Sequence, residues 1–211
     1  MSPSPNLHLV KHPLIDVHLA KLRDAETSSD DFRRHLHIIG QLMIFEVTRH
    51  LETEITTINT PLEATEGAKL KRPIVLVPIL RAGLGMLNGI LTCLPEAQIG
   101  HIGMCRNEET HTPESYYCNL PANIDAADVI LIDPMLATGN SSVEAARQLI
   151  NQGAKHLSFI NLVSCPEGIE QFHKELPDIP IYTAAVDSHL NENAYIVPGL
   201  GDAGDRYFGT L

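Results

Sequence analysis

The sequence predicts an α/β fold built on a parallel sheet flanked by helices. Short apolar runs rich in Val, Ile and Leu occur at residues 73–80, 128–133, 156–163 and 179–186. They lack polar alternation, which suits strands that are covered on both faces. Helix-compatible sequence lies between them, and such alternation indicates a parallel sheet with right-handed crossovers. We therefore expect a single domain over residues 1–211.

The N-terminal region, about residues 1–60, is expected to be helical. Apolar residues recur there at spacings of three and four, which predicts one buried helix face. Ser28 or Ser29 is expected to cap this helix. The stripe consists of Phe32, Leu36, Ile39, Met43 and Val47. We treat this region and residues 110–125 as additions to the α/β domain.

Composition and charge restrict the class of protein. Apolar residues make up 44% and charged residues 19% of the 211 residues, which is ordinary for a globular protein. Lys and Arg number 15 against 26 Asp and Glu, giving a net charge of −11. This balance disfavours binding to a nucleic-acid polymer, although a few arginines and backbone amides can still hold a small phosphorylated ligand. No apolar run approaches the ~20 residues of a membrane span, and residues 1–16 lack a signal-peptide stretch, so we expect a cytoplasmic protein without a membrane partner.

Cysteine and histidine spacing gives no metal-binding pattern. Cys93, Cys105, Cys118 and Cys165 form no C-x-x-C pair, and the eleven histidines include no H-E-x-x-H motif. We expect reduced thiols in or near a core, and no metal held by protein ligands.

A turn of small polar residues follows the apolar run that ends at Asp133. Residues 138–141 open a predicted helix, in which Ser141 and Glu144 have capping-box spacing and Gly153 favours a stop. Backbone amides at such a turn form an anion site, while the lysine of a Walker A loop is missing. An ordinary strand-turn-helix would account equally well for the glycine and serines alone. Asp133 favours a ligand, because a carboxylate there can hold ribose hydroxyls or a magnesium bound to substrate oxygens.

Two arginines also follow apolar runs, Arg81 after residues 73–80 and Arg106 after "IGHIGMC". The guanidinium fork suits phosphate oxygens. Together with the anion turn, they indicate a ligand with phosphates at two places.

The segment from Gly199 to Gly204 matches G-x-G-x-x-G, the dinucleotide-binding pattern. That pattern must open a helix and lead to a second strand about thirty residues on. Only seven residues follow Gly204, so we expect no NAD site here. Glycines still allow the main chain to approach a flat ligand closely.

These blocks resemble, in order, the motifs of the uracil phosphoribosyltransferases. The matching stretches are "LVPILRAGLGM", "RNEET", "VILIDPMLATGNS" and "YIVPGLGDAGDRYFGT", with "HPLID", "LRD" and "EVTR" near the start, and the resemblance covers about residues 8–211. It implies a type I phosphoribosyltransferase fold with a hood, including about residues 187–211, and a flexible arm at about 106–122. The implied reaction joins uracil to 5-phosphoribosyl 1-diphosphate (PRPP) and yields UMP and diphosphate in pyrimidine salvage. Mg²⁺ would be carried by the PRPP diphosphate.

The resemblance also implies a set of site residues. Arg81 and Arg106 would contact the diphosphate, Asp133 the ribose hydroxyls, and residues 137–141 the 5-phosphate. Asp202 would contact PRPP and assist proton loss from the attacking ring nitrogen. The PRPP loop would comprise Asp133, Pro134, Met135, Leu136, Ala137, Thr138, Gly139, Asn140 and Ser141, and uracil would be read by main-chain groups of Ile196, Gly201, Asp202 and Ala203. Uracil presents acceptor, donor and acceptor along one edge, which backbone N–H, C=O and N–H groups can match.

Three positions depart from the pattern of the family or its fold. Asn140 replaces a common glycine and must accept that residue's backbone angle, for which asparagine is suited. Asn119 replaces a common lysine in the arm. Pro134 follows Asp133 where other type I phosphoribosyltransferases carry adjacent acids, which leaves magnesium held mainly by substrate.

Several alternatives stay open at this point. Tyr116 and Tyr117 could close over the site or pack at a subunit contact. The chain could be a regulatory homologue that binds UMP as a signal, or an enzyme for xanthine or orotate. The resemblance implies a homodimer or homotetramer without choosing between them, and it leaves a GTP effector open.

Overall fold

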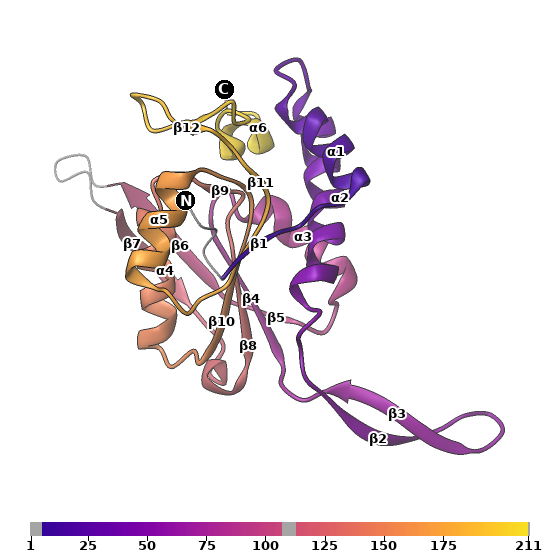
Figure 1. The fold of residues 1–211 in the computed structure, drawn as a ribbon. Helices are drawn as coiled ribbons and strands as arrows, with labels where there is room; N and C mark the ends of the chain where they lie inside the picture. The colour runs from indigo at the N-terminus through magenta and orange to yellow at the C-terminus, as the bar shows by residue number, and fades with distance from the viewer. Residues whose placement is uncertain (1–5, 107–112, 211) are drawn as a thin grey trace.

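A computed structural model describes residues 6–106 and 113–210, and its centre is a mainly parallel sheet (Figure 1). Neighbouring strands are parallel except for the antiparallel pair β6–β7. The strands in spatial order are β1 (Leu7–Leu9), β11 (Ile181–Val186), β10 (His156–Ser164), β8 (Asp128–Ile132), β4 (Ile74–Leu80), β6 (His101–Arg106) and β7 (Pro113–Asn119), with β5 (Gln98–Ile99) beside β4 and β9 (Met135–Leu136) beside β10. All four strands expected from the apolar runs are present, and the expected fold class is confirmed.

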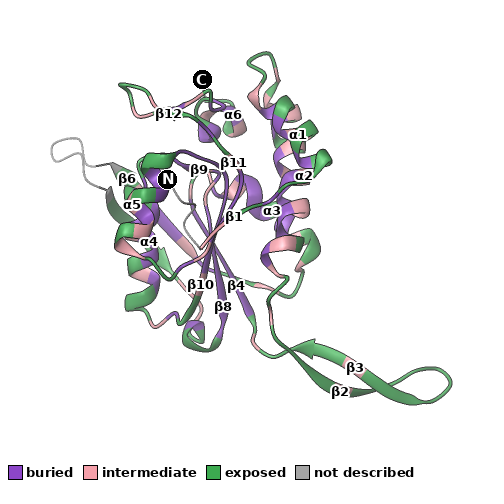
Figure 2. Ribbon diagram, viewed as in Figure 1, coloured by how far each residue is buried: buried purple, intermediate pink, exposed green. Residues whose placement is uncertain are grey.

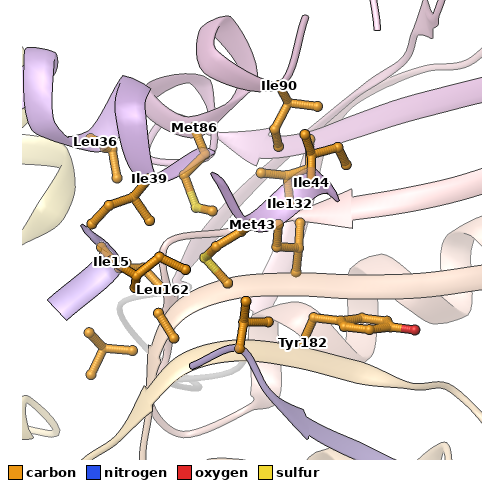
Figure 3. Packing of buried hydrophobic residues seen from close by; sticks show 14 of the residues in the cluster. Ile15, Leu36, Ile39, Met43, Ile44, Met86, Ile90, Ile132, Leu162 and Tyr182 are labelled. Atoms are coloured by element: carbon orange, nitrogen blue, oxygen red, sulfur yellow. The ribbon is translucent and has the colours of Figure 1, made fainter. Parts of the chain in front are cut away.

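Helices cover both faces of this sheet. On one face lie α1 (Pro13–Arg23), α2 (Ser29–Val47) and α3 (Leu84–Cys93), and on the other lie α4 (Asn140–Asn151) and α5 (Pro166–Glu175) (Figure 1). Each face has its own apolar cluster, and the central strands are buried on both sides (Figure 2). The stripe on α2 packs as expected, with Leu36, Ile39 and Met43 meeting Met86 of α3 (Figure 3). Ser28 is the N-cap and accepts a hydrogen bond from the amide of Asp31.

The expectation that residues 1–60 are helical was wrong at both ends of this region, because β1 precedes α1 and a hairpin follows α2. After Val47 the chain forms an antiparallel hairpin, β2 (Thr53–Asn59) and β3 (Ala64–Leu70), which projects from the body of the molecule (Figure 1). Almost the whole hairpin is exposed (Figure 2), including 75% of Ile55 and 95% of Leu62. Because neither face is buried, its sequence lacks the alternation that marks a half-buried strand.

The chain ends in small elements above the carboxyl edge of the sheet. These are β12 (His189–Leu190), β13 (Ile196–Val197) and α6 (Ala203–Phe208), in the part expected to be the hood (Figure 1). A 3₁₀ turn at Ile124–Ala126 leads into β8. In the expected arm, Tyr116 and Tyr117 on β7 are exposed, while residues 107–112 lie outside the described residues.

The four cysteines are all unpaired, but they do not share one environment. Cys165 is buried, whereas Cys93, Cys105 and Cys118 are exposed, so the expectation that the thiols lie in or near a core was wrong for these three side chains. In the described part of the chain, no helix combines the length and hydropathy needed to cross a bilayer.

Candidate functional site

A pocket of about 260 Å³ lies at the carboxyl edge of the sheet, between the turn after β8 and the C-terminal segment. This is the edge at which open α/β sheets bind their ligands. The lining residues are Ala82, Asp133, Met135, Ala137, Thr138, Gly139, Ser141, Ser142, Ala194, Tyr195, Ile196, Gly201, Asp202, Ala203 and Gly204. Two segments that are about sixty residues apart in sequence therefore face one cavity.

The first wall of the pocket, residues 133–142, is held by the backbone of the sheet. The carbonyl of Pro134 accepts hydrogen bonds from the amides of Leu162 and Val163, each 3.0 Å long. The short strand β9 then continues the ladder beside β10. One carboxylate oxygen of Asp133 accepts from the amide of Met135 at 3.2 Å. These contacts fix Asp133 at the tip of its strand with its carboxyl group in the pocket.

The helix that follows this wall begins differently from the expected capping box. Gly139 is the N-cap with φ of +80°, and no side chain caps the helix. Ser141 is thus inside α4, while the hydroxyl of Ser142 donates to the carbonyl of Gly139 at 3.1 Å. Asn140 is already the first helical residue, and the left-handed backbone angle falls on Gly139. The expectation that Asn140 must adopt the backbone angle of a glycine was therefore wrong. The amide of Asn140 donates to the hydroxyl of Thr138 at 3.5 Å, whereas the amides of Ser141 and Ser142 have no partner among the described residues and can donate to an anion.

The electrostatics of Asp133 are unusual for a carboxyl group. Burial raises the pKa of Asp133 from 3.8 to about 7, the amide of Met135 opposes the rise, and the negative charge of Asp202 adds to it. Near neutral pH the free site therefore holds Asp133 as a mixture of acid and carboxylate. A cation or hydroxyl donors beside it would favour the carboxylate.

The second wall of the pocket is formed by residues 194–204. Gly199 and Gly201 have φ of +59° and +77°, a left-handed conformation that disfavours side chains. The amide N–H of Gly201 has no hydrogen-bond partner among the described residues, so it can donate to a ligand. Asp202 is the N-cap of α6, where its Oδ1 accepts from the amide of Asp205 at 2.8 Å. Its second oxygen makes no hydrogen bond to the described residues.

Side chains from distant segments hold this second wall. The guanidinium of Arg23 pairs with both oxygens of Asp187, at 2.6 and 2.7 Å, and donates to the carbonyl of Gly199 at 2.8 Å. Asp187 in turn accepts from the amide of Gly199 at 2.8 Å. The contacts of Gly199 with Arg23 and with Asp187 therefore attach the loop to the end of α1.

A second guanidinium, that of Arg206, is enclosed by main-chain carbonyls. It is 9% exposed and donates to Leu22, to Asp24 at 2.6 Å and to Leu200 at 2.8 Å. Its carbon lies 4.6 Å from the ring centroid of Phe32. The helices α1 and α2 and the loop before α6 thus meet on one charged side chain.

The pocket brings together most of the predicted site residues. Those that line it are Asp133, Met135, Ala137, Thr138, Gly139, Ser141, Ile196, Gly201, Asp202 and Ala203. Pro134, Leu136 and Asn140 belong to the same turn without lining the pocket. Arg81 lies beside the lining residue Ala82, but its side chain is turned to α6, 3.5 Å from Asp205 and over the ring of Phe208. Arg106 ends β6, and its side chain lies outside the described part of the structure.

Sequence reasoning missed several members of the site. Ala82, Ser142, Ala194, Tyr195 and Gly204 line the pocket beside residues that had been selected. Adjacency to those residues was the available signal. The roles of Arg23, Asp187 and Arg206 were also missed, although both arginines lie in quoted motifs, Arg23 in "LRD" and Arg206 in "GDRYFGT".

Comparison with known proteins identifies the family and the fold of the chain. The profile of the family described as uracil phosphoribosyltransferase matches residues 9–210. A curated relative from Acholeplasma laidlawii, named uracil phosphoribosyltransferase, is 50% identical over 204 residues, which are 97% of this chain and 98% of that protein. The solved structure of AQ2163 protein from Aquifex aeolicus superposes with a TM-score of 0.91 at 33% identity, covering 96% of this chain and 97% of its own. A hypoxanthine phosphoribosyltransferase from Staphylococcus aureus, at 16% identity and 82% coverage of each chain, has a TM-score of 0.52 and shows similarity of fold alone.

Proposed function

The chain belongs to the uracil phosphoribosyltransferase family, and we propose that the pocket between residues 133–142 and 194–204 is where it converts uracil and PRPP to UMP and diphosphate. The reaction makes the protein a pentosyltransferase of pyrimidine salvage. The observation that carries the proposal is the shared pocket itself, because one small nucleotide can touch an anion-binding turn and a bare main-chain segment together.

The first wall binds the phosphoribosyl group in this proposal. The amides of Ser141 and Ser142, unpaired among the described residues, and the hydroxyls of Thr138 and Ser141 would hold the 5-phosphate. The carboxylate of Asp133 would accept hydrogen bonds from the ribose hydroxyls. Arg81 would have to leave Asp205 to reach the diphosphate, and this pair is exposed enough for exchange at little cost.

The second wall would recognise the base. The unpaired N–H of Gly201 and the main chain of Ile196 and Ala203 can meet a ring edge without interference from a side chain at residue 201. Cytosine reverses one donor and one acceptor on its edge, so it would leave a buried group unpaired at ~1–3 kcal/mol per group. This difference supports uracil over cytosine.

Catalysis would rest on positioning and on charge. As the bond from the ribosyl carbon to the diphosphate breaks, a nitrogen of uracil attacks that carbon and loses its proton. Asp202 would accept this proton, because one of its oxygens is free while the other caps α6. Fixing both substrates in one pocket can account for ~7–11 kcal/mol of the barrier.

The carboxylates at the site fit a substrate-borne Mg²⁺. Asp133 and Asp202 both line the pocket, and among the described residues no cluster of three or more His, Cys, Asp or Glu forms a protein cage for a metal. Mg²⁺ commonly binds through one or two carboxylates plus substrate phosphates. Bound in this way, it would neutralise charge on the departing diphosphate.

One assay tests the proposed function and its rivals together. The protein is incubated with PRPP, Mg²⁺ and, separately, uracil, cytosine, xanthine or orotate, and nucleotide and diphosphate are measured. We expect UMP and diphosphate with uracil alone. Tight UMP binding without turnover would favour a regulatory homologue instead, and product from orotate or xanthine would reassign the base. The acid-rich "GLGDAGD" segment disfavours orotate, whose extra carboxylate calls for a nearby cation.

Subunit assembly, an effector and location complete the proposal. The projecting β2–β3 hairpin exposes Ile55, Ile58, Leu62 and Leu70, and we propose it as a contact between copies in a homodimer or homotetramer. Sedimentation with and without GTP measures the assembly and tests GTP as an effector. We expect the protein in the cytoplasm.

A further inference from the structure

The loop that faces the base is anchored at one residue, Gly199, through both of its peptide groups. Its N–H donates to Asp187, and its C=O accepts from Arg23. Because Arg23 and Asp187 also pair with each other through two bonds, the three residues form a closed set of contacts. This set, Arg23–Asp187–Gly199, is called the α1 clamp below.

The geometry at Gly199 leaves little freedom for another arrangement. Its φ is +59°, and a Cβ built there would lie 2.1 Å from the carbonyl oxygen of Ile196, a residue that lines the pocket. Two residues later, Gly201 lines the pocket, and its N–H has no hydrogen-bond partner among the described residues. We expect a rotation of the peptides at Gly199 to move the main chain at Gly201 relative to the pocket.

The strength of the clamp depends on burial and charge. The side chain of Asp187 is 6% exposed and that of Arg23 is 24% exposed, so solvent screens this pair less than a surface pair. Neither side chain lines the pocket. Arg23 therefore acts on the site through the main chain of Gly199.

We propose that Arg23 is a positioning residue for the base: it fixes the orientation of the 199–201 main chain and thereby the affinity and selectivity for uracil. The inference rests on the proposed function and adds a determinant from the opposite end of the sequence. The first wall of the pocket has its own attachment to the sheet, so we expect PRPP affinity to depend much less on Arg23 than uracil affinity does.

The chain contains a matched control for the ion pair. Arg72 is 22% exposed and pairs with Asp128, which is 13% exposed, at 3.1 Å. Asp128 opens β8 at the end of the strand opposite Asp133, and Arg72 also pairs with Glu52. Arg72 thus resembles Arg23 in burial and partner but is remote from the site.

The test compares Arg23→Gln, Arg23→Lys and Arg72→Gln with the unaltered protein. For each protein, kcat, the KM for uracil, the KM for PRPP and the thermal midpoint are measured, and cytosine is tested as a competing base. We expect Arg23→Gln to raise the KM for uracil about tenfold, equivalent to ~1.4 kcal/mol, with the KM for PRPP within about twofold. Arg72→Gln should lower the thermal midpoint without separating the two KM values.

Arg23→Lys distinguishes positioning from neutralisation of Asp187. Lysine keeps the charge but lacks the guanidinium fork that reaches both Asp187 and Gly199. The thermal midpoint of Arg23→Lys should therefore approach that of the unaltered protein, while its KM for uracil remains raised. If Arg23→Gln does not fold, this variant still decides the question.

The outcomes separate the inference from the proposed function. Equal changes in both KM values, or a thermal loss alone as in Arg72→Gln, would overturn the role of Arg23. Absence of UMP formation by the unaltered protein in the same assay would overturn the proposed function instead.

Discussion

The two walls of the pocket are held by different kinds of interaction. The wall of residues 133–142 continues a buried strand, and its carbonyls join the β10 ladder while Leu136 is fully buried. The wall of residues 194–204 contains little regular structure, and its loop is attached to α1 through Arg23 and Arg206. Local packing therefore fixes the first wall, whereas charged contacts between the two ends of the chain fix the second. Substitutions in the contacts that hold the first wall should therefore change the KM for PRPP, and those that hold the second wall should change the KM for uracil.

The largest effect is expected at Asp202, where the second wall meets the chemistry. Asn and Asp are about equally good N-cap residues, so Asp202→Asn should preserve α6 and remove only the charge. We expect kcat to fall by about 10²–10⁴, the usual range for loss of a general base. Undiminished turnover, with a thermal midpoint equal to that of the unaltered protein, would remove the proposed proton role.

Gly168→Ala should disturb the first wall alone. A Cβ at this position of α5 would lie 2.3 Å from the carbonyl oxygen of Ala137 and 2.6 Å from that of Leu136. Since backbone atoms cannot move aside without shifting the turn, the KM for PRPP should rise more than about tenfold while that for uracil changes less. Gly67→Ala is the control, because its Cβ meets the side chain of Ile58 on the remote hairpin. An equal rise in both KM values would show that the walls are not independent.

The pH dependence should reveal an electrostatic link between the walls. Because the pKa of Asp133 is about 7, kcat/KM for PRPP should fall about tenfold from pH 8 to pH 6 as the carboxylate is protonated. The charge of Asp202 contributes to that raised pKa, so Asp202→Asn should move the acid limb to lower pH. An acid limb that remained in Asp133→Asn would belong to another group.

The same group predicts a change in stability with a definite sign. The folded pKa of Asp133 lies above its ordinary value of 3.8, so the folded state retains a proton that the unfolded state releases. The contribution of the Asp133 proton to the free energy of unfolding is fully present below about pH 4 and is lost as pH rises through about 7. The thermal midpoint of ligand-free Asp133→Asn should therefore exceed that of the unaltered protein more at pH 8 than at pH 5.

The smallest effect is expected from Arg206→Lys, which weakens the second support of the second wall. Lysine cannot span the carbonyls of Leu22, Asp24 and Leu200 with a rigid fork. We expect the KM for uracil to rise about fivefold with a lower thermal midpoint. Arg33→Lys is the control, because this exposed arginine also donates to a carbonyl of α6, that of Tyr207, but does not contact the loop before α6. Equal effects of the two substitutions would argue against a special role of Arg206.

The sequence predicted the first wall better than the second for a physical reason. A buried parallel strand and the glycine turn after it are local patterns, so β8, Asp133 and the start of α4 could be placed from about twenty consecutive residues. The error within that wall, the capping box at Ser141, arose because Gly139 rather than a side chain begins the helix. For the second wall the motif indicated main-chain recognition, but nothing local identifies Arg23 as a partner of Gly199.

The hairpin of β2 and β3 was not predicted because its sequence carries no pattern imposed by burial. Its residues are exposed on both faces, so burial imposes no period on the sequence. The side chain of Arg81 shows a further limit of sequence reasoning, because position at a strand end does not determine whether a long side chain enters the pocket or packs on α6.

The joining of the chain ends at Arg206 has a consequence for synthesis of the protein. Arg206 is synthesised 184 residues after Leu22 and 182 residues after Asp24, whose carbonyl groups accept its hydrogen bonds. A nascent chain can complete every strand of the central sheet before this arginine leaves the ribosome. The uracil side of the pocket would then be the last part to assemble, because the main chain at Leu200 gains its attachment to Asp24 only when Arg206 is in place.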